Sequence, residues 1–127
     1  MARRPIFGGI KPPKQPTPEK AKNPFEAAHN RTLAIEAGQN RICLSLRYDG
    51  ESRIVEVQVV GTTRKDRPAM RVYQVDPQPD PTPSKNFRLL CFDECFGVAL
   101  TQRQSAPPRS NENNRDKGFN RIEWAYV

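Results

Sequence analysis

The sequence predicts a mainly β fold, a small antiparallel barrel preceded by one N-terminal helix and a disordered basic arm. Between residues 41 and 101, short segments alternate apolar and polar residues with a period of two, which is typical of strands with one buried face. Turn signals separate these segments: an Asp-Gly pair, a basic loop and a proline-rich loop. Arginines recur on the polar faces. The length of 127 residues suits a single domain with one modest core.

Residues 1–22 differ in composition from the domain that we assign to residues 23–127. Residues 1–24 hold six basic residues and one acidic residue, a net charge of +5, out of +7 for the whole chain. Five prolines and few large apolar groups leave too little apolar surface to offset the entropy of ordering, so we predict a disordered or extended arm. Such an arm attracts phosphates or acidic partners without a specific site. Its KPPKQPTP stretch also suits an aromatic groove that binds polyproline helices, although a spacer is the commoner role.

One helix is predicted after the arm. Asn23 can cap it, Pro24 suits its first position, and Glu26 stands three residues after the cap, as a capping box requires. Gly38 is the expected left-handed residue that ends it. The face expected to pack against the open end of the barrel consists of Phe25, Ala28, Thr32 and Ile35.

The first two strands are predicted to form a hairpin. The buried face of the first strand is expected to hold Ile42, Leu44, Leu46 and Tyr48. Asp49-Gly50 then suits a type I′ turn, because both central positions of that turn need positive φ. In the second strand we assign Val55, Val57 and Val59 to one face, and Ile54, Glu56, Gln58 and Val60 to the other. Both faces are expected to be covered.

A basic loop and the third strand hold the residues of most functional interest. The loop contains Arg64, Lys65 and Arg67, which are ordinarily solvated but could also contact phosphate. On the third strand Arg71 and Tyr73 share a face, and this pair could bind a phosphate and stack on a base. The alternative is that Tyr73 packs in the core with the stem of Arg71 over it.

Two further strands are predicted at residues 87–92 and 96–100, after a stiff proline-rich loop at 76–85. Asp93 and Glu94 lie between them at a turn. Such an acidic pair could bind a metal or act in acid–base chemistry, but we expect it only to solvate a corner.

Residues 102–118 are predicted to form a polar loop. The chain then alternates apolar and polar residues over 121–127, with Trp124 among the apolar ones. A terminal segment with a tryptophan is expected to add a last strand or to cover a sheet edge.

The three cysteines, Cys43, Cys91 and Cys95, support neither a disulfide framework nor a zinc ribbon, since their number is odd and none is in a CxxC spacing. They are expected to be small apolar residues of a reduced, cytoplasmic protein. The chain has no apolar run of about 18 residues, so no membrane partner is expected.

Enzymatic activity is not expected. His29 is the only histidine, and we expect it at the surface. The chain has no Ser-His-Asp order, no phosphate-binding GKS/T loop and no metal-ligand cluster, so no cofactor is expected either.

The segments RICLSLRYDGESRIVEVQVVG, MRVYQVD and NFRLLCFDEC, in this order, resemble the WYL domain, a small Sm-like or SH3-like barrel of bacterial and phage proteins. The positions that match its short motifs are Tyr48, Arg53-Ile54-Val55-Glu56, Met70-Arg71-Val72-Tyr73 and Arg88-Leu89-Leu90 with Asp93. The ending DKGFNRIEWAYV also looks like the close of stand-alone members. Val57 stands where the family pattern has proline, and the three-letter signature appears as Val-Tyr-Gln.

The resemblance implies a ligand-sensing barrel that binds a nucleotide or single-stranded nucleic acid through basic groups across the sheet. By position these groups are Arg53, Arg71 and Arg88, with Tyr48 and Tyr73 as stacking surfaces. Arg64 and Lys65 of the basic loop complete the candidate site.

The function expected first is therefore a non-catalytic regulatory or ligand-sensing module. The alternative is a protein-interaction or inhibitor protein, or an accessory subunit, of phage or defence-associated type. In that case the arm and the proline-rich loops would contact a larger partner, and the barrel would be a scaffold. Assembly into a homo-oligomer is left open.

Overall fold

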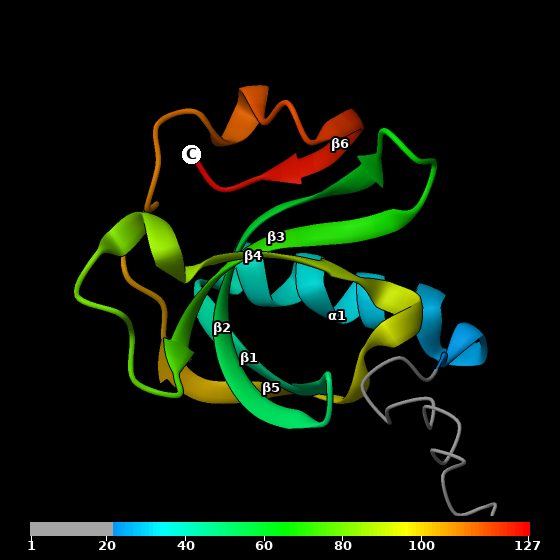
Figure 1. Cartoon of the computed structure of the whole chain (residues 1–127), viewed down its shortest axis with the longest axis horizontal. Helices are drawn as coiled ribbons and strands as arrows, with labels where there is room; N and C mark the ends of the chain where they lie inside the picture. The colour runs from blue at the N-terminus through cyan, green and yellow to red at the C-terminus, as the bar shows by residue number, and fades with distance from the viewer. Residues whose placement is uncertain (1–21) are drawn as a thin grey trace, which may run out of the picture.

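The computed structural model describes residues 22–127 and consists of an antiparallel six-stranded sheet with one α-helix (Figure 1). The mainly β class is thus confirmed, whereas the prediction for the arm lies outside the described residues except at Lys22. The helical elements are η2 (Pro24–Glu26), α1 (Ala27–Asn40), η3 (Pro83–Asn86), η4 (Phe92–Glu94) and η5 (Asn113–Arg115). The strands are β1 (Ile42–Tyr48), β2 (Glu51–Thr63), β3 (Pro68–Asp76), β4 (Phe87–Cys91), β5 (Phe96–Gln104) and β6 (Phe119–Ala125).

The sheet has the order β4-β3-β2-β1-β5, and β6 pairs with β2. The length of β2 allows it to pair with two strands along one edge, because β1 pairs with its first half and β6 with its second half. In Figure 1, β6 accordingly lies at the opposite end of the domain from β1 and β5. Among the described strands no ladder joins β4 to β5, so the sheet is not closed and the predicted barrel is not confirmed.

The hairpin between β1 and β2 forms as the sequence predicts. Asp49 has φ 53° and Gly50 has φ 72°, the positive values that a primed turn needs. Tyr48 pairs directly with Glu51 across the turn. This register places Leu44, Leu46 and Tyr48 together in the core.

Strand β2 departs from the predicted alternation. The β2–β3 ladder has a register shift between Val57 and Val59, which is the signature of a bulge. As a result Val60 joins Val55 and Val57 in the main core, while Val59 packs in a second cluster with Ala69, Cys91 and Phe119. The prediction that Val59 shares a face with Val57 is therefore wrong, because the extra residue reverses the faces. The prediction that both faces are covered is confirmed, since β2 is buried from Val55 to Gly61.

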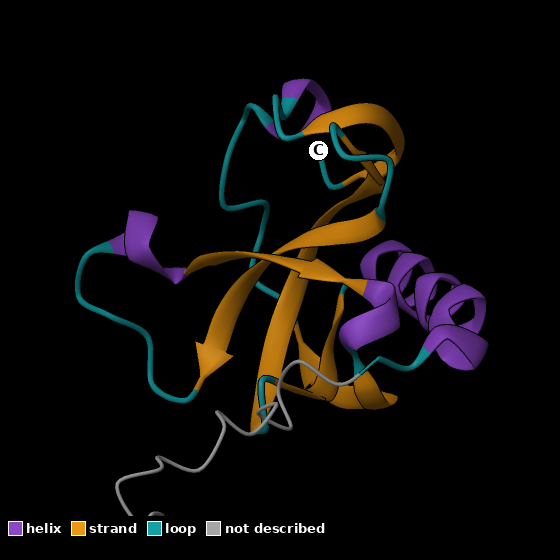
Figure 2. Ribbon diagram, turned by 45° about the vertical axis from the view of Figure 1, so that its right-hand side comes forward, coloured by secondary structure: helices purple, strands orange, loops and turns teal. Residues whose placement is uncertain are grey.

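The helix α1 packs along one side of the sheet through small residues (Figure 2). Its buried positions are Asn30, Ala34, Ala37 and Gly38. The expected face is wrong except at Ile35, which packs against the core. Ala28 and Thr32 are exposed. Phe25 is 97% exposed, because it lies in η2, before the α-helix begins. The expected stop is also wrong. The helix runs two residues past Gly38 to Asn40, and Arg41 takes the left-handed conformation with φ 57°.

Gly38 has another role, which is close packing. A Cβ atom at this position would lie 2.3 Å from the ring of Trp124 on β6. The ring of Trp124 is also stacked on that of Tyr126, with a centroid separation of 6.0 Å. The predicted terminal strand is therefore confirmed, and its tryptophan packs β6 against the helix.

Candidate functional site

The loop between β5 and β6 covers the outer face of β2 and β3. Two buried side chains of β2 hold it there. The carboxylate of Glu56 accepts hydrogen bonds from the backbone N–H of Ala106 (2.8 Å) and from Nε of Arg109 (2.7 Å). The Gln58 Oε1 atom accepts from the backbone N–H of Arg109 and from Nδ2 of Asn113, each at 3.0 Å. The polar positions of β2 are thus the anchor points of this loop.

The anchored loop brings Asp116 to Arg71 on β3. The guanidinium of Arg71 binds the Asp116 carboxylate with two donors, Nε to Oδ2 at 2.9 Å and Nη2 to Oδ1 at 3.2 Å. The backbone N–H of Gly118 donates to Oδ1 as well, at 2.8 Å. Partial burial by itself would raise the pKa of Asp116, but the hydrogen bonds from Arg71 and Gly118 outweigh it and hold the pKa below its ordinary value.

A pocket of about 370 Å³ opens beside this ion pair. Its lining residues are Arg71, Phe87, Ser110, Glu112, Asn113, Arg115, Asp116 and Lys117. It therefore contains one aromatic wall, three cations and two carboxylates. An arginine fork beside an aromatic ring and two further cations is a set that can bind an anion attached to a flat, apolar group.

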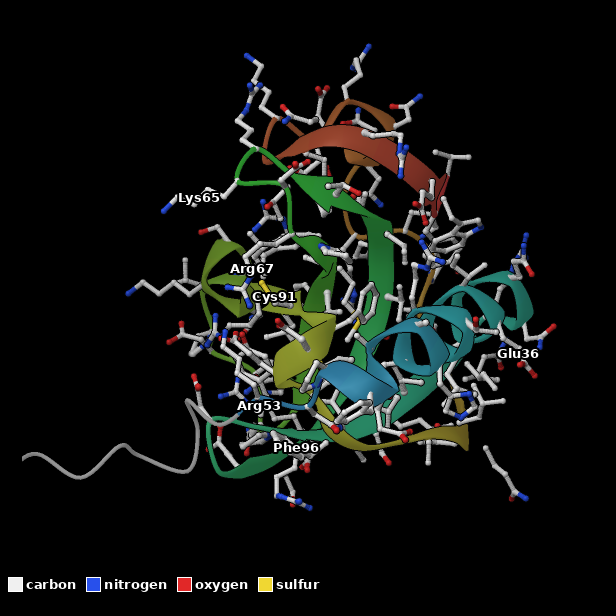
Figure 3. All side chains as sticks on the ribbon, turned by 90° about the vertical axis from the view of Figure 1, so that its right-hand side faces the viewer. Glu36, Arg53, Lys65, Arg67, Cys91 and Phe96 are labelled. Carbon is white, nitrogen blue, oxygen red and sulfur yellow. The ribbon has the colours of Figure 1, made fainter. Side chains whose placement is uncertain are left out.

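The basic loop between β2 and β3 contacts the segment 117–118 beside this pocket. The Nε of Arg64 donates to the carbonyl oxygen of Lys117, and the Arg64 backbone N–H donates to that of Gly118. Lys65, the next residue, is exposed and extends away from the ribbon (Figure 3). We call the five cations gathered here the basic end; they are Arg64, Lys65, Arg71, Arg115 and Lys117.

The structure thus brings three predicted site residues, Arg64, Lys65 and Arg71, together with two that the sequence did not suggest. Arg115 and Lys117 were missed because they lie in a loop more than 40 residues after Arg71. The only local signal for them is that they lie on either side of Asp116, directly before Gly118. The pairing of Asp116 with Arg71 depends on the fold of the loop.

The two tyrosines predicted to stack on a ligand are in the interior. Tyr48 is 9% exposed, and its hydroxyl donates to Glu94. Burial, together with the neighbouring Glu94 carboxylate, raises the pKa of Tyr48 above its ordinary value. Tyr73 is 6% exposed.

Tyr73 lies beneath two other side chains. The ring of Phe87 meets it edge-on with a centroid separation of 5.2 Å, and Cζ of Arg109 lies 4.1 Å from its centre. Tyr73 is therefore covered by an arginine, as the alternative interpretation expected, but the arginine is Arg109. The half-buried Phe87 is the aromatic residue that reaches the pocket.

The remaining two predicted arginines are placed elsewhere. The side chain of Arg53 is 10% exposed. It lies over the ring of Tyr48 and donates to Oε1 of Gln74 at 3.3 Å. In Figure 3 it lies well away from Lys65. Arg88 donates to the backbone carbonyls of Lys85 and Phe87. Neither arginine lines the pocket beside Arg71.

The acidic pair at η4 is more than a solvated corner. Arg67 of the basic loop bonds Asp93 at 2.7 Å and lies 3.5 Å from Glu94. Lys22, at the junction with the arm, bonds Glu94 at 2.8 Å. This network ties both Lys22 and the basic loop to η4, and Figure 3 shows Arg67 close to Cys91.

The cysteines of the described part of the chain are unpaired and buried. Burial raises the pKa of the Cys95 thiol to about 12. Within residues 22–127, no three His, Cys, Asp or Glu side chains are grouped so as to hold a metal ion. Over the same residues, no helix has the length and apolar character needed to cross a membrane.

No protein-family model, no curated protein and no solved structure matches this chain.

Proposed function

We propose that this chain is a non-catalytic binding module for nucleotides or single-stranded nucleic acid, of the regulatory type that its resemblance to the WYL domain implies. The observation that carries the proposal is the pocket in which the Arg71 fork, Phe87 and the cations Arg115 and Lys117 meet. A cytoplasmic location is part of the proposal.

Charge and shape both favour this ligand class. The pocket holds three cations against two carboxylates. Arg64, which donates to the carbonyl oxygen of Lys117, and its neighbour Lys65 add positive charge beside it. A guanidinium binds a phosphate with two donors, and an aromatic side chain can stack on any base. The volume of about 370 Å³ lies at the lower end of the range for small-molecule sites, which suits a single nucleotide.

The other predicted site residues have supporting roles in this proposal. Tyr73 packs against Phe87 and limits how that ring can turn. Tyr48 and Arg53 stabilise the interior beside the first hairpin. The basic arm adds a non-specific attraction that raises the rate of encounter with a polyanion.

The test is the binding of fluorescent single-stranded DNA and RNA oligonucleotides, followed by anisotropy at about 50 and 200 mM salt. We expect Arg71→Ala and Lys117→Ala to weaken binding and to reduce its salt dependence. Arg88→Ala is the matched control, because Arg88 is a cation on the neighbouring strand that does not line the pocket. The proposal fails if Arg71→Ala binds as tightly as Arg88→Ala. Loss of binding only on deletion of residues 1–22 would assign the contact to the arm.

One observation favours the second function, a contact with a larger protein partner. Phe25 is 97% exposed, three residues after Lys22, where the arm joins the domain. An exposed aromatic residue beside a basic tether suits a partner with an apolar pocket and an acidic rim. In that case Phe25→Ser would abolish partner binding that persists at high salt, while Arg71→Ala would leave it unchanged.

A further inference from the structure

The fork of Arg71 already holds an anion that belongs to the chain itself. Both of its bonds, at 2.9 and 3.2 Å, go to the Asp116 carboxylate. The side chain of Asp116 is only 15% exposed, and the Gly118 N–H supplies a third hydrogen bond at 2.8 Å. A phosphate that binds through these same Nε and Nη2 donors must therefore replace Asp116.

The loop that carries Asp116 makes this replacement difficult. Asn113 is buried, and its amide donates to Gln58 at 3.0 Å and to the carbonyl of Tyr126 at 2.8 Å. The loop is thus fixed just before Asp116, so the carboxylate stays close to Arg71 at a high effective concentration. A competing ligand needs a larger negative charge than one carboxylate to displace it.

Phosphate groups differ from one another in negative charge. An internal phosphodiester of a nucleic acid carries one negative charge and has no advantage over Asp116. A terminal phosphate monoester carries about −1.5 to −2 charges at pH 7 and offers three acceptor oxygens. Three acceptors match the donors that Asp116 now occupies, which are Nε and Nη2 of Arg71 and the N–H of Gly118.

We infer that the pocket selects a terminal phosphate monoester on a nucleotide, which displaces Asp116 from Arg71, in preference to an internal phosphodiester. This inference rests on the proposed function. The monoester belongs either to a free mononucleotide or to a phosphorylated end of a single strand. Phe87 lies on the pocket wall for the base, and Lys117 and Arg115 flank the displaced carboxylate and compensate its charge.

The experiment compares oligonucleotides of one sequence with a 5′-phosphate, a 3′-phosphate or only hydroxyl ends. We expect at least one phosphorylated form to bind about tenfold more tightly than the hydroxyl form, because of its extra charge at the fork. Adenosine monophosphate, adenosine and inorganic phosphate are titrated in parallel. If the free nucleotide binds more tightly than both phosphorylated strands, the monoester belongs to a mononucleotide. If a phosphorylated strand binds more tightly than the free nucleotide, the monoester belongs to a strand end.

The variant that tests the mechanism is Asp116→Asn. Without the competing carboxylate, internal phosphodiesters gain access to Arg71, so the hydroxyl-ended strand should bind more tightly and the tenfold preference should shrink. Asp116→Ser is the second variant, since a serine can still accept the hydrogen bond from Gly118 if asparagine disturbs the turn. Glu36→Gln is the control. It removes an exposed carboxylate of α1 that does not line this pocket, and it should keep the preference.

The outcomes separate the inference from the proposed function. If all strands bind equally to the wild type and Arg71→Ala abolishes that binding, the inference is overturned and the proposed function stands. If Asp116→Asn keeps the full preference, displacement of Asp116 is overturned. If neither the strands nor the mononucleotide bind, both are overturned.

Discussion

The guanidinium of Arg109 lies between a carboxylate and an aromatic ring, with Nε 2.7 Å from Oε1 of Glu56 and Cζ 4.1 Å from the centre of Tyr73. Glu56 is 3% exposed. A buried carboxylate is tolerated only when it is paired and hydrogen-bonded. This pair therefore helps to hold the β5–β6 loop, and with it Asp116, against the sheet.

Arg109→Ala is expected to lower the free energy of unfolding by about 3 kcal/mol, because it leaves the buried Glu56 carboxylate without its cation. Glu56→Gln should cost less, about 1–2 kcal/mol, since a neutral amide is easier to bury. Urea unfolding measures both. Arg103→Ala, which removes an exposed arginine of β5, is the control and should cost under about 0.5 kcal/mol. An equal cost for Arg109→Ala and Arg103→Ala would mean that the pair does not hold the loop.

The stability of the domain should depend on pH through Asp116. Its pKa is held below the ordinary value in the folded state, so its contribution is complete above the unfolded pKa of about 3.9. That contribution is lost as the pH falls through the lowered folded value. The difference in unfolding free energy between the wild type and Asp116→Asn should therefore shrink below about pH 4.

Urea titrations of the two proteins at a series of pH values measure this difference. The comparison also separates the effect of Asp116 from that of Glu94. Burial alone would raise the pKa of Glu94, but Lys22, Tyr48 and Arg67 lower it below its ordinary value. A difference that stays constant from pH 6 to about pH 3 would contradict the role of the Arg71 contact.

Gly38→Ala should destabilise the domain although alanine favours helices. The new methyl group would lie 2.3 Å from the ring of Trp124, and overpacking of this kind costs about 1–3 kcal/mol. This exceeds the gain of about 1 kcal/mol in helix propensity. Trp124 is the only tryptophan, so its fluorescence during urea unfolding reports on this contact directly. The control is Gln39→Ala, at an exposed neighbouring position; a Gly38→Ala protein as stable as this control would refute the packing argument.

Phe87→Ala should weaken the binding of single-stranded oligonucleotides by about 1–3 kcal/mol if its ring stacks on a base. Phe96→Ala is the matched control, because Phe96 is a half-buried aromatic residue of β5 that does not line the pocket. Fluorescence anisotropy measures both. Equal losses in the two variants would show that Phe87 is not the stacking surface.

Local features of the chain could be predicted because they depend on neighbouring residues. The turn at Asp49-Gly50 forms because an Asp-Gly pair accepts positive φ. The buried face of β1 follows from a period of two that no bulge interrupts between β1 and β2. The place of Trp124 in a terminal strand follows from the cost of leaving a large aromatic side chain in water.

The helix face and the second half of β2 could not be predicted in the same way. The η2 turn moves Phe25 out of the helix, and the bulge after Val57 exchanges the faces of Val59 and Val60. Both changes are set by the elements that pack against these segments.

The sequence by itself therefore determined the mainly β class, the first hairpin and the terminal strand, because local backbone preference and alternation of polarity encode them. Tertiary structure alone decided that Glu56 and Arg109 fasten the β5–β6 loop and that Asp116 reaches Arg71. The residues of these pairs are 53 and 45 positions apart. No local pattern specifies such partners, because they meet only when the loop closes over β2 and β3.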